Sequence, residues 1–414
     1  MTNTIHTDVC IVGAGPAGSF ASLFLDKAGI NCLLVDKAKF PRDKICGDGI
    51  SGWVLGILNL LDEDILLRLS KQPFLLHSHG IRIVSPNFSE LDLPFIDENM
   101  FKKGLPPGFI ARRIDFDQFM IDEVKKRAGV KLLENCEVSG YSLLKDGTEL
   151  STGDGKTIHA KLVIFANGAG SKFMKDPGGI HKDPKFTMTG IKTYFNGVTG
   201  FHEQNYVELI FLKKLLPGYF WIFPLPGGMA NVGVGLDQFR IRKKKINLKT
   251  MMLQAIETEP YLKERFKNAE QVTKVEAYGL PLWDKKRPIS GHRFMLAGDT
   301  ASLIDPVTGE GMGHAAITGM LAARQAVRSL NTQDFSATFM KQYDESVYDM
   351  IGKELAISSK ILNFIKYPWL FNGVINKAAK SKTLQEKLSL AMTDLEVRKK
   401  LRKPSLYLKI LMGR

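Results

Sequence analysis

Three glycines near the N-terminus have the spacing that phosphate binding requires. Gly13, Gly15 and Gly18 form a GxGxxG turn after the β-prone residues 9–12, and a helical pattern begins at residue 19. The first glycine suits a tight turn, the second lets backbone approach a pyrophosphate, and the third lets the helix pack closely on the strand. The helix N-terminus offers free N–H groups and the positive end of its dipole to phosphate oxygens.

A carboxylate completes this pattern. Asp36 lies 18 residues after Gly18, at the end of a second β-prone run, 32–35. An acid there can accept both hydroxyls of an adenosine ribose. The alternative is a glycine-rich turn in another α/β fold, but the complete strand–turn–helix–strand order favours a dinucleotide site. A later glycine-rich turn at Gly168 lacks the spacing and a matching acid, so a nicotinamide cofactor with its own Rossmann domain is not expected.

Composition limits the remaining possibilities. The chain has 414 residues, 44% of them hydrophobic, which is enough to bury the cores of two or three units. Its net charge of +14 comes without a nucleic-acid motif, so we expect an anionic lipid or acidic substrate and no nucleic acid. The four cysteines lack metal-binding spacing, and Cys10 and Cys32 suit core strands, as in a reducing compartment. A short polar N-terminus and the lack of a long apolar run predict a cytoplasmic protein with neither a secretory signal nor a transmembrane helix.

The order of the predicted elements indicates an α/β fold with a discontinuous Rossmann-like domain, a second sheet-rich domain over the cofactor and a helical C-terminal region. Periodicity predicts helices over 53–69, 113–128, 249–265 and 312–329, and buried strands over 130–133, 161–166 and 294–297. The expected boundaries are 1–73, 108–171 and 291–335 for the first domain, 74–107 and 172–290 for the second, and 336–414 for the C-terminal region.

Further motifs carry a family resemblance. They are RxxFD at 113–117, a glycine-rich turn within 164–171, and a GD pair at 298–299 followed by DPVTGEGM at 305–312. With GxGxxG, they resemble the FAD-dependent enzymes of the aromatic-hydroxylase-like superfamily over about residues 8–330. The stretches FPRDKICGDG at 40–49, YxWxFP at 219–224 and GxG at 233–235 are most similar to the geranylgeranyl reductase family.

The resemblance implies non-covalently bound FAD and a set of residues that contact it. Asp299 would meet the ribityl hydroxyls of the flavin, and its alternative role is a helix cap. The helix start at Met312 would stabilise negative charge on the reduced ring, and its alternative is an ordinary glycine-rich helix entry. The full expected set is Gly13, Gly15, Pro16, Ala17, Gly18, Asp36, Lys37, Arg42, Cys46, Gly47, Arg113, Gly168, Asp299, Pro306, Gly309, Gly311 and Met312.

Two residues of the KICGDG loop are the candidates for catalysis. By resemblance, Cys46 lies near the flavin ring, where it would help protonation or shape the site, and Asp48 is a similar candidate. The alternative for Cys46 is a small buried side chain. His314, in the first turn of the helix that begins at Met312, could donate a proton, but we favour a histidine on the helix surface.

An aromatic stripe is the candidate substrate wall. Tyr219, Trp221 and Phe223 alternate, so they share one face of a strand, and Gly233 and Gly235 share one face of the next. Aromatic rings beside a gap left by glycines would line an elongated apolar cavity for a polyprenyl chain. Spacing alone allows core packing of a sheet as the alternative, and the family signature favours the cavity.

The resemblance implies an FAD-dependent oxidoreductase that reduces C=C bonds of a geranylgeranyl-type chain on a prenyl lipid or prenyl diphosphate. The electron donor, NADPH or a reduced carrier, is not indicated by the sequence. The alternatives are a flavin-dependent monooxygenase or halogenase, and a non-catalytic flavin- or lipid-binding protein at the membrane. Apolar residues at 362–371 before the basic tail 377–414 suit peripheral attachment to the anionic inner face of a membrane, or else a helical cap over the second domain.

Overall fold

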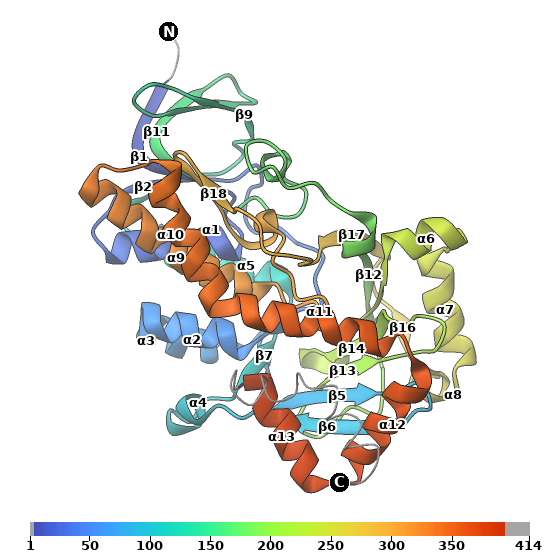
Figure 1. Cartoon of the computed structure of the whole chain (residues 1–414). Helices are drawn as coiled ribbons and strands as arrows, with labels where there is room; N and C mark the ends of the chain where they lie inside the picture. The colour runs from blue at the N-terminus through green and yellow to red at the C-terminus, as the bar shows by residue number, and fades with distance from the viewer. Residues whose placement is uncertain (1–3, 394–414) are drawn as a thin grey trace.

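Two large β-sheets and one small sheet organise residues 4–393, the part of the chain that the computed structural model describes. Figure 1 shows the first sheet, with the N-terminal strand, beside the second sheet, and helices cover the outer faces of both. The first sheet draws its strands from residues 4–165 and 290–296, and the second from 80–94 and 187–281. The chain therefore passes between the two sheets several times.

The first sheet contains the N-terminal strand–helix–strand unit. Its central strands are parallel, and the two that flank the glycine turn are buried on both faces at 9–12 and 32–35, as expected for a parallel sheet with helices on its faces. The strand order is β18-β19-β11-β1-β2-β8, with β10 and β9 continuing from β11. The strands are β1 (Thr4–Val12), β2 (Cys32–Val35), β8 (Val130–Leu133), β9 (Val138–Leu143), β10 (Thr148–Thr152), β11 (Thr157–Phe165), β18 (Ser290–Gly291) and β19 (Phe294–Leu296).

The second sheet is mainly antiparallel and has the order β16-β12-β15-β14-β13-β5-β6, with β17 paired to β12. Its strands are β5 (Gly80–Val84), β6 (Glu90–Pro94), β12 (Thr187–Asn196), β13 (Val207–Ile210), β14 (Tyr219–Pro224), β15 (Met229–Asp237), β16 (Glu270–Gln271) and β17 (Glu276–Pro281). The small sheet, β3 (Gly49–Ile50), β7 (Gly108–Ile110) and β4 (Leu76–Ser78), connects the two.

The four helices that periodicity predicts are all present, and two of them are divided, whereas α4 (Glu98–Lys102) and α6 (Gln238–Lys244) were not predicted. The helix predicted over 53–69 is two helices, because the Asp62 side chain accepts a hydrogen bond from the Asp64 amide at 2.9 Å and so caps a new helix. The helix predicted over 249–265 likewise divides before Pro260. The helices are α1 (Pro16–Lys27), α2 (Gly52–Leu61), α3 (Glu63–Ser70), α4 (Glu98–Lys102), α5 (Arg113–Lys125), α6 (Gln238–Lys244), α7 (Leu248–Thr258), α8 (Pro260–Lys263), α9 (Met312–Thr332), α10 (Ala337–Val347), α11 (Lys353–Ile365), α12 (Pro368–Ala379) and α13 (Lys382–Thr393).

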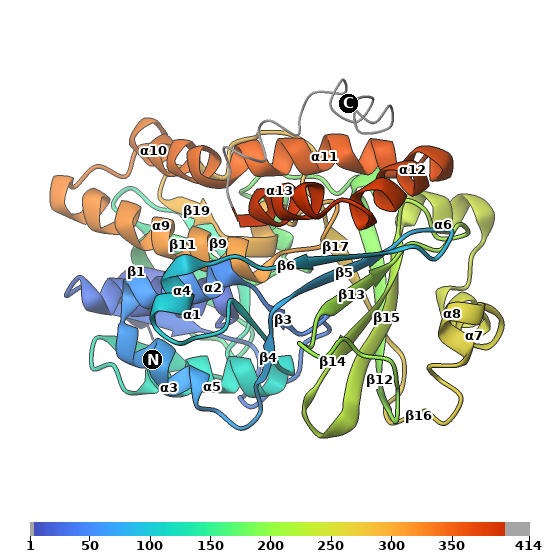
Figure 2. The same ribbon diagram turned by 90° about the horizontal axis from the view of Figure 1, so that it is seen from below.

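The last four helices run along one side of the molecule (Figures 1 and 2). Helix α10 packs on α9 and β18, whereas α12 and α13 pack on β6 of the second sheet. The part of the predicted basic tail at 394–414 lies outside the described residues. None of the described helices has the combination of length and apolar character that would let it cross a bilayer.

Candidate functional site

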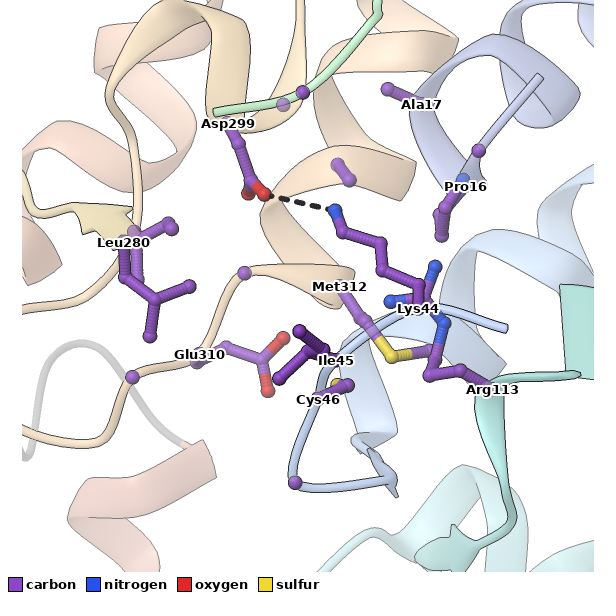
Figure 3. A pocket seen from close by; sticks show the side chains of 18 of the residues that line it. Pro16, Ala17, Lys44, Ile45, Cys46, Arg113, Leu280, Asp299, Glu310 and Met312 are labelled. Atoms are coloured by element: carbon purple, nitrogen blue, oxygen red, sulfur yellow. Dashed lines mark hydrogen bonds and ion pairs between the residues drawn. The ribbon is translucent and has the colours of Figure 1, made fainter. Parts of the chain in front are cut away.

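A cavity of about 1240 Å³ lies where the two large sheets meet. Its walls come from the glycine turn before α1, the loop at residues 42–53, the start of α9, and one face of the second sheet. It therefore joins the expected nucleotide cradle to the aromatic stripe as one continuous space. Figure 3 shows its central part, with residues from the glycine turn, the cysteine loop and the start of α9 around it.

The glycine turn is shaped by close backbone contacts. Gly13 has a φ of +103°, and a Cβ there would lie 2.6 Å from the Ala166 carbonyl oxygen. A Cβ at Gly18 would lie 1.8 Å from the carbonyl oxygen of Gly13, so the strand and α1 can approach only without side chains. Gly15, the N-cap of α1, faces the cavity and receives no side-chain cap. The turn thus leaves a helix N-terminus open toward the cavity.

Asp36 is oriented by two backbone hydrogen bonds. The Ala14 amide donates to one carboxylate oxygen at 2.7 Å, and the Ala38 amide donates to the other at 2.8 Å. The carboxylate therefore lies fixed at the edge of the cavity beside the glycine turn. A carboxylate held there has further lone pairs for the hydroxyls of a ribose.

The other end of the cradle is formed by Asp299 and the start of α9. The Asp299 carboxylate lies 3.2 Å from the Lys44 ammonium, and both side chains line the cavity (Figure 3). Gly311 is the N-cap of α9 and offers no capping side chain, and Gly309 has a φ of +72°. The close glycine packing, the open N-terminus of α1 and the two carboxylates fit the pyrophosphate, ribose and ribityl groups of FAD.

Arginines link the cysteine loop to the RxxFD helix. The buried Arg113 guanidinium donates two hydrogen bonds of 2.8 Å to Asp117, and Arg42 reaches the same carboxylate at 2.7 Å. Burial favours the neutral form of Asp117, but the charges of Arg113 and Arg42 prevail and hold its pKa below the usual value. Burial raises the pKa of the Cys46 thiol above its usual value, although the nearby Arg113 charge opposes the shift.

Asp48 does not line the cavity. Its side chain is fully buried beneath the loop, where the hydroxyl of Tyr194 donates to it at 2.8 Å and the amide of Asn231 donates at 2.7 Å. Asn231 also donates to the Cys46 carbonyl at 2.8 Å and accepts from the Trp221 indole at 2.8 Å. Burial raises the pKa of Asp48 to about 6, although these hydrogen bonds and the nearby Lys192 charge oppose the shift.

This hydrogen-bonded set, Asp48, Tyr194, Asn231 and Trp221, fastens the cysteine loop to the second sheet. The buried Lys192 ammonium extends it by donating to the Tyr194 hydroxyl at 3.0 Å. Sequence analysis missed Lys192, Tyr194 and Asn231. The available signal was a lysine and an asparagine in the interior of two long β-prone stretches.

The aromatic stripe follows the predicted alternation. Tyr219, Trp221 and Phe223 line the cavity from β14 and pair across the sheet with Gly235, Gly233 and Asn231 of β15, respectively. A Cβ at Gly233 would lie 2.2 Å from the Trp221 ring, and one at Gly235 would lie 2.4 Å from the Met188 sulfur. The two glycines therefore make room for neighbouring side chains and do not form the cavity surface themselves.

Contacts beyond the sheet hold the stripe against the cradle. The Tyr219 hydroxyl donates to the Thr308 carbonyl at 2.9 Å, in the loop before α9. The Phe223 ring lies 3.2 Å from the position of a Cβ on Gly47, so it packs on the cysteine loop. Larger residues at this glycine would displace the ring or the loop.

Glu310 is a cavity residue that sequence analysis passed over within the DPVTGEGM motif. Its carboxylate accepts from the Gly313 amide at 2.6 Å and lies beside Ser51. Burial raises the pKa of Glu310, the nearby Glu354 carboxylate adds to the rise, and His314 opposes it. The expectation that His314 lies on the helix surface was wrong. Its side chain is only 1% exposed, because that side of α9 is covered by other parts of the chain. Its Nδ1 atom lies 2.7 Å from the Leu303 carbonyl oxygen.

Most of the predicted site residues surround this one cavity. Those that line it are Gly13, Gly15, Pro16, Ala17, Asp36, Lys37, Arg42, Cys46, Gly47, Arg113, Gly168, Tyr219, Trp221, Phe223, Asp299, Gly309, Gly311 and Met312. Those that lie behind its surface are Gly18, Asp48, Gly233, Gly235 and Pro306.

Two family models match the chain in the regions that build this cavity. An FAD binding domain matches residues 6–60, and a geranylgeranyl reductase catalytic domain matches residues 188–278. The first contains the glycine turn, Asp36 and the cysteine loop, and the second contains the aromatic stripe.

Curated relatives match over most of their length. A digeranylgeranylglycerophospholipid reductase of Methanosphaera stadtmanae is 28% identical over 372 residues, which cover 87% of this chain and 88% of that protein. A menaquinone reductase of Mycobacterium tuberculosis is 25% identical over 374 residues, covering 87% of this chain and 84% of that protein.

Solved structures share the fold. A geranylgeranyl bacteriochlorophyll reductase-like protein of Thermoplasma acidophilum superposes with a TM-score of 0.79 and 24% identity, covering 96% of this chain and 99% of that one. A halogenase solved in complex with FAD superposes with a TM-score of 0.71 and 16% identity, covering 95% and 84% of the two chains. The expected α/β architecture with a Rossmann-like FAD-binding domain is confirmed.

Proposed function

We propose that this chain, which belongs to the geranylgeranyl reductase family of FAD-dependent oxidoreductases, saturates C=C bonds in a geranylgeranyl-type chain carried by a lipid or a prenyl diphosphate. The observation that carries the proposal is the continuity of the cavity, in which the nucleotide cradle opens directly onto the Tyr219–Trp221–Phe223 stripe. An elongated apolar space that ends at a flavin suits a polyprenyl substrate.

The cradle residues would hold FAD in an extended pose. The glycine turn would bind the pyrophosphate, Asp36 the ribose and Asp299 the ribityl hydroxyls, with the start of α9 beside the ring. When bound and reduced, FAD supplies hydride for transfer to carbon. The aromatic stripe would keep water from the substrate and hold an alkene against the ring edge by apolar contact.

The cysteine loop has two separable roles in this proposal. Cys46 would border the reacting face, because it lines the cavity together with Arg113. Asp48 would act as a positioning residue through the hydrogen bonds that connect it to Tyr194 and Asn231. In this role Asp48 contacts neither substrate nor cofactor, in contrast to the direct participation expected from the sequence.

Peripheral membrane association would give the enzyme access to a lipid substrate. Trp369 and Tyr367, at the start of α12, are 70% and 57% exposed, and the exposed Lys360 and Lys366 lie close by in sequence. Exposed aromatic rings beside lysines suit the interface of an anionic bilayer. Vesicle co-sedimentation that is lost in Trp369→Ala would support this part of the proposal. Equal sedimentation of both proteins would refute the role of this residue.

Anaerobic flavin spectroscopy tests the proposed activity. Holoprotein reduced with dithionite should regain its oxidised flavin absorbance when geranylgeranyl diphosphate or a digeranylgeranylglycerophospholipid is added. Menadione, a quinone without a prenyl chain, serves as a comparison oxidant. Reoxidation by oxygen or menadione, but by neither prenyl compound, would refute the proposal and favour the monooxygenase or halogenase alternative.

A further inference from the structure

Saturation of an alkene needs a proton as well as a hydride, so a proton donor must reach the cavity. Three titratable groups that line the cavity are engaged in other contacts or held by burial. The Tyr219 hydroxyl already donates to a backbone carbonyl at 2.9 Å, and Asp299 is ion-paired with Lys44 at 3.2 Å. Burial raises the pKa of the Cys46 thiol, which makes it a weaker acid.

Glu310 differs from these groups in its surroundings. Figure 3 shows its carboxyl pointing toward Ile45 and the cysteine loop, from a position two residues before Met312. No basic side chain forms an ion pair with it among the described residues. Its pKa is raised by burial, to which the negative charge of Glu354 adds, and these outweigh the opposing charge of His314 and the hydrogen bond from Gly313.

From these observations we propose that Glu310 is the catalytic acid that protonates the alkene, an inference that rests on the proposed function. The O–H bond of the Glu310 carboxyl breaks, and its electron pair stays on the carboxylate. The π electron pair of the alkene forms a new C–H bond with that proton, while hydride adds to the other alkene carbon. The product is the alkane, and the deprotonated Glu310 regains its proton from solvent after product leaves.

The local structure suits the carboxylate that this step leaves behind. The Gly313 amide donates to it at 2.6 Å, at the positive end of the α9 dipole. Two titratable neighbours face it, His314 from α9 and Glu354 from α11. A donor must be protonated, so the rate should fall as pH rises through the pKa of Glu310.

Glu310→Gln is the direct test, because the amide oxygen can still accept from Gly313. Reduced holoprotein is mixed anaerobically with geranylgeranyl diphosphate, and flavin reoxidation and product mass are followed. Wild type should react at least about 100-fold faster than the variant, the scale of general acid catalysis. The matched control is Asp344→Asn, a buried carboxyl on α10 whose pKa is also raised, to about 6, but which lies outside the cavity lining. This control should keep the wild-type rate.

Infrared difference spectroscopy provides a readout without turnover. At pH 7 the wild-type spectrum should contain a protonated-carboxyl band that is missing from Glu310→Gln, while FAD affinity is equal in both. Equal turnover rates, or no difference in that band, would overturn the inference and leave the proposed function intact. A wild-type protein that saturates neither geranylgeranyl diphosphate nor a digeranylgeranyl lipid would overturn the proposed function, and the inference with it.

Discussion

Replacing Asp48 with asparagine should change how stability depends on pH. Two hydrogen bonds of the set that fastens the cysteine loop end on this carboxylate, from Asn231 and from Tyr194, and Trp221 joins the set by donating to Asn231. The asparagine side chain has the same shape as that of Asp48. However, its amide cannot ionise, and its NH₂ group cannot accept a hydrogen bond from Asn231 or Tyr194. The substitution therefore removes a titration from a buried position.

The size of the effect follows from the shift in pKa. The pKa of Asp48 rises from an ordinary 3.8 to about 6 in the folded protein, so the folded state binds the proton more tightly than the unfolded state. Protonated Asp48 therefore stabilises the folded protein. This stabilisation is complete below the pKa that Asp48 has in the unfolded chain, and it is lost as pH rises through the pKa of Asp48 in the folded protein. The whole shift amounts to about 3 kcal/mol, of which about 2 kcal/mol falls between pH 4.5 and 8.

Urea unfolding of the holoprotein and of Asp48→Asn at several pH values measures this effect. The free energy of unfolding of the variant, relative to wild type, should rise by about 2 kcal/mol between pH 4.5 and 8. The difference between the free energies of unfolding of the two proteins cancels the contributions of Asp344, Glu208 and Glu310, whose pKa values are also raised. A difference that stays constant with pH would refute the reasoning about Asp48.

Three further substitutions test the cradle, the wall and the loop. Asp36→Ala should weaken FAD binding about 10- to 100-fold in a fluorescence titration, since a hydrogen bond to a charged group contributes about 1.5–3 kcal/mol; unchanged affinity would exclude Asp36 from the site. Trp221→Ala should slow turnover of a geranylgeranyl chain about tenfold without loss of FAD, whereas Phe220→Ala, on the opposite buried face of β14, should lower stability; a parallel loss of FAD, activity and stability in Trp221→Ala would make the stripe core packing. Cys46→Ser should alter rate, product pattern or flavin spectrum with a stability loss of about 1 kcal/mol, and an enzyme unchanged in all three would remove Cys46 from the mechanism.

The parts of the site that were predictable are those encoded by short contiguous patterns. Spacing alone identifies features that depend on a few neighbouring residues. These are the GxGxxG turn, Asp36 and the GD pair at 298–299 that follows a strand. The alternation of Tyr219, Trp221 and Phe223 was also readable, because side chains on a strand repeat every two residues.

The parts that were missed depend on contacts between distant segments. Asp48 meets Tyr194 and Asn231 across separations of 146 and 183 residues, and no local pattern carries that pairing. The roles of Gly233 and Gly235 were misjudged for a related reason. Their missing side chains suggested a gap in the cavity wall, but Trp221 and Met188 fill that space from neighbouring strands.

Mass spectrometry of the substrate after a single anaerobic turnover tests the central claim most directly. Dithionite-reduced holoprotein is incubated with geranylgeranyl diphosphate or a digeranylgeranyl lipid, and unreduced protein serves as the control. If the chain is an isoprenoid reductase, the substrate gains about two mass units for each double bond saturated, one hydride and one proton, and only with reduced protein. Prenyl lipid that binds tightly but leaves with its mass unchanged would contradict the account and identify a carrier instead.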